Sequence, residues 1–202
     1  AGDRIVFRKK EIAAWASQRI LGFKDTELAT YHRSSSVASR VHPDHHLILP
    51  SLIKPQFIAA ELPARTRAAA IRQMVKLADS TERLYSPEDL LEGVLEREEL
   101  CSTALRGGFA LLHPRHHDPY MYEESFVVLA RTINPIPFGA PDGATPDLFV
   151  LICCDEDRLH LHTLARLSTI LAQDDIRQEL RLASNRDEMY DILLRTEQQL
   201  AM

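Results

Sequence analysis

Two histidines stand where imidazole chemistry could be used. His113 directly follows the apolar run 109–112, which itself follows the glycine pair at 107–108. Because such a run predicts a core strand, His113 is expected at the point where that strand leaves the sheet, and this edge is where ligands and chemistry collect in α/β proteins. A surface histidine in a polar loop is the alternative that the spacing alone leaves open.

His160 lies 47 residues further on, near the start of a stretch with helical periodicity. It precedes Leu164 by four residues and Leu167 by seven, so it shares the apolar side of the predicted helix. His162 is offset by two residues and is expected to face water with Arg166. For His160 by itself, a core histidine bonded to backbone is the alternative.

Together, the two side chains fit phosphoryl transfer. A neutral imidazole is a nucleophile near physiological pH, because its ordinary pKa is about 6.5. Transfer to phosphorus demands positioning and stabilisation of charge on the equatorial oxygens. His113 would be the acceptor, and His160, the guanidinium of Arg97 and the hydroxyls of Ser102 or Thr103 could bind the oxygens.

We predict no cofactor and no metal. The sequence has no GxxxxGKS/T loop and no acidic metal-binding signature, so a phosphoryl group would come from a protein donor. The histidine-rich segments 42–46 and 113–117 lack a matched zinc motif such as HExxH, and the adjacent Cys153 and Cys154 do not form CxxC.

Composition is that of an ordinary globular protein. The 202 residues are 45% hydrophobic and carry a net charge of −5, which argues against a large nonspecific nucleic-acid surface. The longest apolar run, 148–154, is too short to cross a bilayer, and no signal-like segment opens the chain. Three cysteines do not make a disulfide framework, so we expect a cytoplasmic protein.

Periodicity divides the chain into three parts. Residues 1–23 predict a short strand and an amphipathic helix, a unit too small to bury a core alone, and the polar residues 24–46 predict a linker. Residues 47–202 predict one α/β domain. Its strands are expected at 57–62, 108–112, 125–133 and 147–154, and its helices at 66–79, 87–100, 158–172, 175–183 and 186–199.

Several motifs in register resemble one known family. The pattern RExLxSTxxxxGxAxxH (97–113), then PIPFGAPDG (135–143), then HLHTLARLS (160–168) is similar to the type-2 enzyme IIA domains of the bacterial phosphotransferase system. These are the fructose/mannitol domains and their nitrogen-regulatory relatives. The resemblance covers about residues 47–200. It implies a three-layer α/β/α domain with a mixed central sheet, the phosphotransferase/anion-transport-like enzyme IIA fold.

The resemblance also implies roles for individual residues. His113 matches the phosphorylated histidine, His160 the second active-site histidine and Arg97 the active-site arginine, with Ser102 and Thr103 as weaker candidates. The phosphoryl donor would be the carrier HPr or a paralogue. The recipient would be a regulatory protein, or a IIB protein.

Two residues depart from the family pattern, which has Pro before the active histidine and Gly after it. Here these positions are Leu112 and Pro114. Proline stiffens the backbone after His113 and removes an N–H that could bind phosphate. We expect a regulatory phosphoryl carrier, and hence a phosphotransferase component if it is active. A sugar-specific IIA and a phosphorylation-incompetent binding module are the alternatives.

Residues 1–23 resemble the closing strand and helix of an excisionase-type, MerR-like winged helix-turn-helix. They would then be the remnant of a DNA-binding domain, with DNA as a candidate partner through the part that precedes residue 1. An amphipathic arm that packs on the domain is the alternative. The sequence predicts no oligomeric state.

Overall fold

The computed structural model describes residues 15–16, 47–116 and 120–201. The predicted N-terminal strand and the linker at 24–46 lie outside these ranges, as does nearly all of the predicted N-terminal helix. The division of the chain into three parts therefore stays a prediction.

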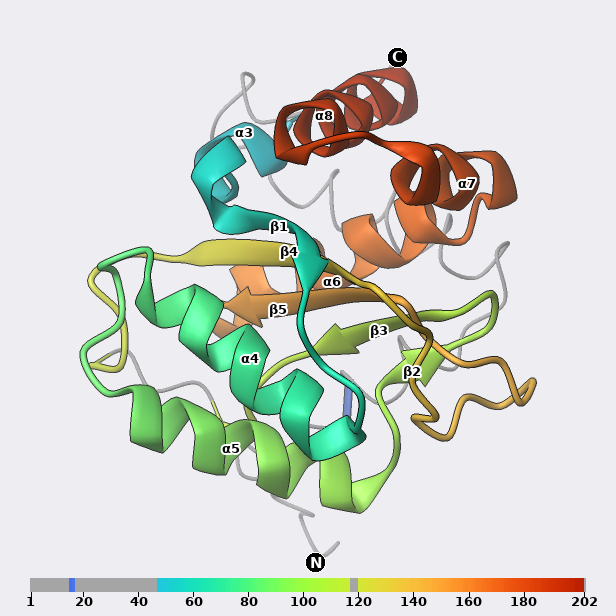
Figure 1. Cartoon of the computed structure of the whole chain (residues 1–202). Coiled ribbons are helices and arrows are strands. Elements are labelled where there is room, and N and C mark those ends of the chain that lie inside the picture. Colours follow the sequence, from blue (N-terminus) through green and yellow to red (C-terminus); the bar gives the residue numbers. More distant parts are fainter. Residues whose placement is uncertain (1–14, 17–46, 117–119, 202) are drawn as a thin grey trace, which may run out of the picture.

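A mixed five-stranded sheet forms the centre of the domain, with strand order β1-β4-β5-β3-β2 (Figure 1). The pairs β1–β4 and β3–β5 are parallel, whereas β4–β5 and β2–β3 are antiparallel. This confirms the predicted mixed sheet. The strands are β1 (Ile58–Leu62), β2 (Ala104–Leu105), β3 (Phe109–Leu112), β4 (Phe126–Thr132) and β5 (Leu148–Cys153).

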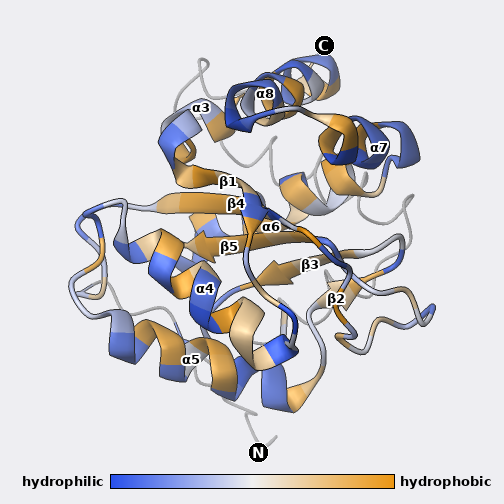
Figure 2. Ribbon diagram, in the orientation of Figure 1, coloured by the Kyte–Doolittle hydropathy of each residue, from blue (hydrophilic) through white to orange (hydrophobic). Residues whose placement is uncertain are grey.

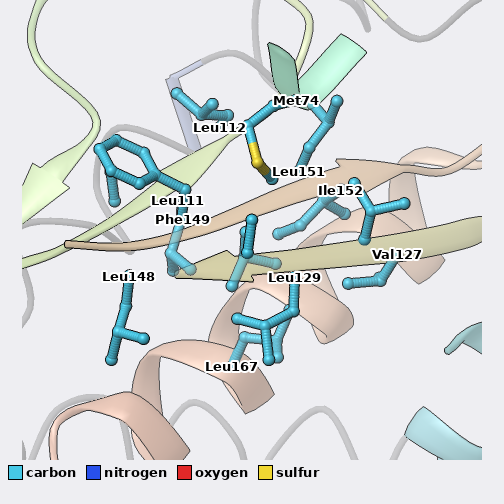
Figure 3. Close-up of a cluster of buried hydrophobic side chains, with 14 of the residues drawn as sticks. Met74, Leu111, Leu112, Val127, Leu129, Leu148, Phe149, Leu151, Ile152 and Leu167 are labelled. Carbon is cyan, nitrogen blue, oxygen red and sulfur yellow. The ribbon is translucent and has the colours of Figure 1, made fainter. Parts of the chain in front are cut away.

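Helices cover the sheet on both faces, which confirms the predicted α/β/α layers. Met74 of α4 and Leu167 of α6 contact the sheet from opposite sides (Figure 3). No helix within the described ranges is long and apolar enough to cross a membrane. The helices are α3 (Leu49–Leu52), the 3-10 turn η1 (Pro55–Phe57), α4 (Arg67–Asp79), α5 (Pro87–Leu100), α6 (Asp157–Leu171), α7 (Asp174–Leu182) and α8 (Arg186–Ala201).

Two helices, α5 and α8, start where their predicted capping residues lie. Ser86 Oγ accepts a hydrogen bond from the Asp89 N–H at 3.3 Å, and proline occupies the first position of α5. Before α8, Asn185 Oδ1 accepts a hydrogen bond from the Glu188 N–H at 3.0 Å. The short elements β2, α3 and η1 were not predicted, because two to four residues carry no periodicity.

The core lies on both sides of β5. Every residue of this strand is buried, as its continuous apolar sequence predicts for a strand covered on two faces. Figure 2 shows the same pattern in colour, with hydrophobic strands at the centre and hydrophilic residues on the outer sides of the helices. The strands therefore form a rigid platform whose ends can position polar groups.

Glu197 of α8 links this last helix to residues 48–49, at the start of α3. Its buried carboxylate accepts hydrogen bonds from the N–H groups of Ile48 at 2.9 Å and Leu49 at 3.0 Å. Arg166 Nε of α6 lies 3.5 Å from the same carboxylate. Burial raises the pKa of this carboxyl, and these three donors oppose the rise. These contacts hold residues 48–49 against α8.

We expect Glu197→Ala to lower the free energy of unfolding by about 3–5 kcal/mol, because it removes the carboxylate that pairs with the buried Arg166 and accepts from two backbone N–H groups. Urea unfolding followed by circular dichroism measures the change. Gln198→Ala, at the exposed next position of α8, is the control. Equal stability of the two variants would show that Glu197 does not hold the start of the domain.

Candidate functional site

Parallel pairing of β3 and β5 brings the two histidines together. His113 follows the carboxyl end of β3, and the carboxyl end of β5 leads within a few residues into α6, whose first turns carry His160 (Figure 1). Parallel strands end at the same edge of a sheet. The two imidazole ring centroids lie 5.0 Å apart with planes tilted by 50°. Both side chains are buried, at 2% and 0% exposure.

Arg97, in the last turn of α5, reaches the same place. Its Nε donates a hydrogen bond to His113 Nε2 at 3.0 Å, and its Nη1 donates to the Cys101 carbonyl at 3.1 Å. The side chain is only 2% exposed. Its Nη2 is buried and, within residues 47–116 and 120–201, makes no hydrogen bond. A buried guanidinium N–H beside a nucleophile is suited to bind an oxyanion.

The contacts of His113 define its tautomer. Nδ1 lies 3.0 Å from the Leu111 carbonyl oxygen, which can only accept, so Nδ1 carries the proton. Nε2 must then hold the lone pair, because Arg97 donates to it. The ring is therefore neutral in this geometry, and Nε2 is its nucleophilic atom.

The hydroxyls of Ser102 and Thr103 donate to other groups. Ser102 Oγ donates to the Phe138 carbonyl at 2.5 Å, and Thr103 Oγ1 donates to Glu98 Oε2 at 2.6 Å. Both bonds fasten the connection between α5 and β2. In this arrangement the two hydroxyls hold the backbone, and their role at a phosphate stays a prediction.

Glu98, next to Arg97, is a structural residue that the sequence analysis did not single out. Its buried carboxylate accepts the Thr103 N–H as well as the hydroxyl, and forms an ion pair with Arg67 Nη2 at 2.8 Å. Burial raises the pKa of the Glu98 carboxyl, although Thr103 and Arg67 oppose this. Glu98 is the Glu of the RExLxST pattern, and this was the signal in the sequence from which the residue could have been found. These contacts of Glu98 with Thr103 and Arg67, called here the Glu98–Thr103 clasp, hold the end of α5, from which Arg97 extends.

The structure separates His162 from the site, but the prediction that it faces water is wrong. The ring is partly buried, and this burial, followed by the charges of Arg166 and Arg158, lowers its pKa. Helical phase correctly places it away from His160. However, α8 packs on this second side of α6 at Arg166, whose Nε lies 3.5 Å from the Glu197 carboxylate.

The chain is similar to proteins of one system. Residues 51–196 match the family model described as "Phosphoenolpyruvate-dependent sugar phosphotransferase system, EIIA 2". A nitrogen regulatory protein of Escherichia coli (strain K12) is 29% identical over 156 residues, which are 76% of this chain and 94% of that protein.

A longer relative and a solved structure agree with this match. The fructose-specific EIIABC component of Bacillus subtilis (strain 168) is 25% identical over 147 residues, 72% of this chain but only 23% of that protein. The crystal structure of the nitrogen regulatory protein IIA-Ntr from Neisseria meningitidis is 26% identical and has a TM-score of 0.64. That alignment covers 71% of this chain and 97% of the other.

The three cysteines differ in reactivity. Cys101 is exposed, whereas Cys153 and Cys154 are buried. Burial raises the pKa of the Cys153 thiol well above its usual range and that of Cys154 to about 12. Since the thiolate is the reactive species, iodoacetamide at pH ~8 should modify Cys101 alone in the folded protein. Mass spectrometry of peptides measures this, with the urea-unfolded protein, modified at all three positions, as the control. Modification of Cys154 before unfolding would contradict it.

Proposed function

The chain belongs to the family of the phosphoenolpyruvate-dependent sugar phosphotransferase system, EIIA 2, and we propose that it is a phosphoryl carrier whose acceptor is His113. One observation carries the proposal. His113 Nε2 faces a buried guanidinium whose Nη2 makes no hydrogen bond to the residues that the structure describes, and the His160 ring lies 5.0 Å from the His113 ring. Nucleophile and oxyanion donors thus share one site.

The transfer uses the lone pair of Nε2. This atom attacks the phosphorus of a phosphohistidine on an HPr-like carrier, and the carrier's N–P bond breaks as the His113 Nε2–P bond forms. The new bond places positive charge on the imidazole ring. Nδ1–H retains its hydrogen bond to the Leu111 carbonyl, whose partial negative charge stabilises that ring.

The hydrogen bond from Arg97 Nε to His113 Nε2 cannot persist once the N–P bond forms. His113 Nε2 then has no lone pair to accept a hydrogen bond. Arg97 Nε must therefore leave Nε2 and donate to a phosphoryl oxygen instead. Nη2 is a further donor in the same plane, which gives the two-point contact that guanidinium groups make with phosphate. His160, whose ring lies 5.0 Å from that of His113, supplies a second imidazole.

Arg97 also controls access to the nucleophile. His113 is only 2% exposed, and the guanidinium contacts the very atom that must react. Transfer therefore requires the Arg97 side chain to move from Nε2 to the incoming oxygens. If it does not move, the chain is the phosphorylation-incompetent binding module that the substitutions at residues 112 and 114 suggest.

We further propose a regulatory role. Phosphorylation adds a charge of about −1.5 to −2 at pH ~7 and three acceptor oxygens to a previously neutral ring, a change that a protein partner can sense. The E. coli relative named a nitrogen regulatory protein aligns over nearly its whole length. The fructose-specific relative favours the second candidate, a sugar-specific IIA that passes the group to a separate IIB protein.

The test is phosphorylation by phosphoenolpyruvate, enzyme I and HPr or a paralogue. We expect acid-labile label on the wild-type protein, none on His113→Ala, and a rate lowered by about 10²–10³-fold in Arg97→Ala, since that is the usual effect of removing one oxyanion donor. His160→Ala is expected to be slowed as well. His116→Ala removes an exposed histidine near the site and should label normally.

The outcomes separate the candidate functions. Absence of label from every cognate carrier overturns the phosphoryl-carrier proposal and leaves the binding module. Transfer of label from the wild-type protein to a IIB protein would favour sugar uptake. Stable label with a changed affinity for a regulatory protein would favour regulation.

A further inference from the structure

Helix α5 contacts the segment after β3 at two points, one helical turn apart. Arg97 contacts His113, and Gly93 contacts residues 114–115. Residues four apart lie on the same side of a helix. The segment 113–115 therefore runs along one side of α5, and the contact at Gly93 is the nearest support for the contact at Arg97.

The first support is a backbone hydrogen bond. The Arg115 N–H donates to the Gly93 carbonyl at 2.9 Å. Pro114 has no N–H, so this amide is the first backbone donor after His113. This N–H of Arg115 is already bonded to α5. The backbone that follows the nucleophile thus serves to hold α5 in place.

The second support is a close approach that only glycine allows without a shift. A Cβ on Gly93 would lie 3.1 Å from Pro114 Cβ and 3.7 Å from Pro114 Cα. Carbon atoms in favourable contact lie about 3.5–4.0 Å apart, so even one methyl group at residue 93 would push the two segments apart. The helical backbone of Gly93 has no positive φ that would require glycine. Backbone conformation therefore does not require glycine at residue 93, whereas the close approach of Pro114 does.

We propose that Gly93 and Pro114 form a positioning pair for the phosphoryl transfer at His113, a role that rests on the proposed function. The ring of Pro114 fixes the backbone after the nucleophile, and the missing side chain at Gly93 lets α5 approach that ring. Their separation sets how far the Arg97 guanidinium is from His113 Nε2. The pair explains how a site with proline after its histidine keeps its arginine in contact.

The test is a double-mutant cycle in the whole chain. Gly93→Ala should lower the maximal rate of phosphorylation by about 3–10-fold, because a shift of a few tenths of an ångström is a fraction of the one-ångström misplacement that costs about 100-fold. The KM for the carrier should stay near that of the wild type. In the Pro114→Gly background, where the ring is gone, the same alanine should change the rate by less than about threefold, the coupling expected of residues in contact.

A second readout does not depend on phosphorylation. Ring-nitrogen NMR of the wild-type protein should show His113 as the neutral Nδ1–H tautomer with a hydrogen-bonded Nε2. Gly93→Ala should shift the Nε2 signal toward that of Arg97→Ala, and addition of Pro114→Gly should restore it. Glu92→Ala, at the exposed neighbouring position of α5, should change neither rate nor signal.

The outcomes distinguish this proposal from the proposed function. A wild-type protein that takes no label refutes the carrier role, while the NMR signals still test the pair. Normal labelling of Gly93→Ala with unchanged ring signals overturns the positioning pair alone. Alanine favours the helix, while its Cβ meets Pro114 Cβ, so any loss of stability in Gly93→Ala should disappear in the Pro114→Gly background. A loss of stability equal in both backgrounds would instead show a purely structural role and overturn the proposal.

Discussion

The hydrogen bond from Arg97 Nε to His113 Nε2 joins the end of helix α5 to the end of strand β3. Burial of a guanidinium is costly unless acceptors compensate it, and here an imidazole lone pair accepts from Nε and a backbone carbonyl accepts from Nη1. Everything around this bond keeps its two ends in place. The Glu98–Thr103 clasp holds the last turn of α5, and the Leu111 carbonyl holds the far side of the His113 ring.

The sheet supplies the second constraint. Because β3 and β5 run parallel, their carboxyl ends place His113 and the start of α6 at one edge. Two imidazoles and a guanidinium then meet in a largely buried space, where electrostatic interactions are stronger than in water. The same burial makes access a separate step, so the site combines a prepared nucleophile with a side chain that has to move before it reacts.

The two residues that differ from the family pattern, Leu112 and Pro114, both pack against neighbouring elements. Leu112 is fully buried at the end of β3, and Pro114 packs on the helix that carries the arginine. Arg97, His113 and His160 meet at one place although both neighbours of His113 differ from the family pattern. Pro114 fits there because the facing residue of α5, Gly93, has no side chain.

The sequence by itself determined the longer helices and strands, because their periods and capping residues are local. It singled out His113, His160 and Arg97 through their positions in the family motifs. Helical phase placed His160 inward but misjudged His162, since phase cannot tell that α8 covers the second side of α6. Tertiary structure alone decided the strand order and the tautomer of His113. It also left Arg97 Nη2 without a hydrogen bond in the part of the chain that the structure describes. It also decided the Gly93–Pro114 approach, because residues 21 positions apart meet only when the helix packs against the segment that follows the strand.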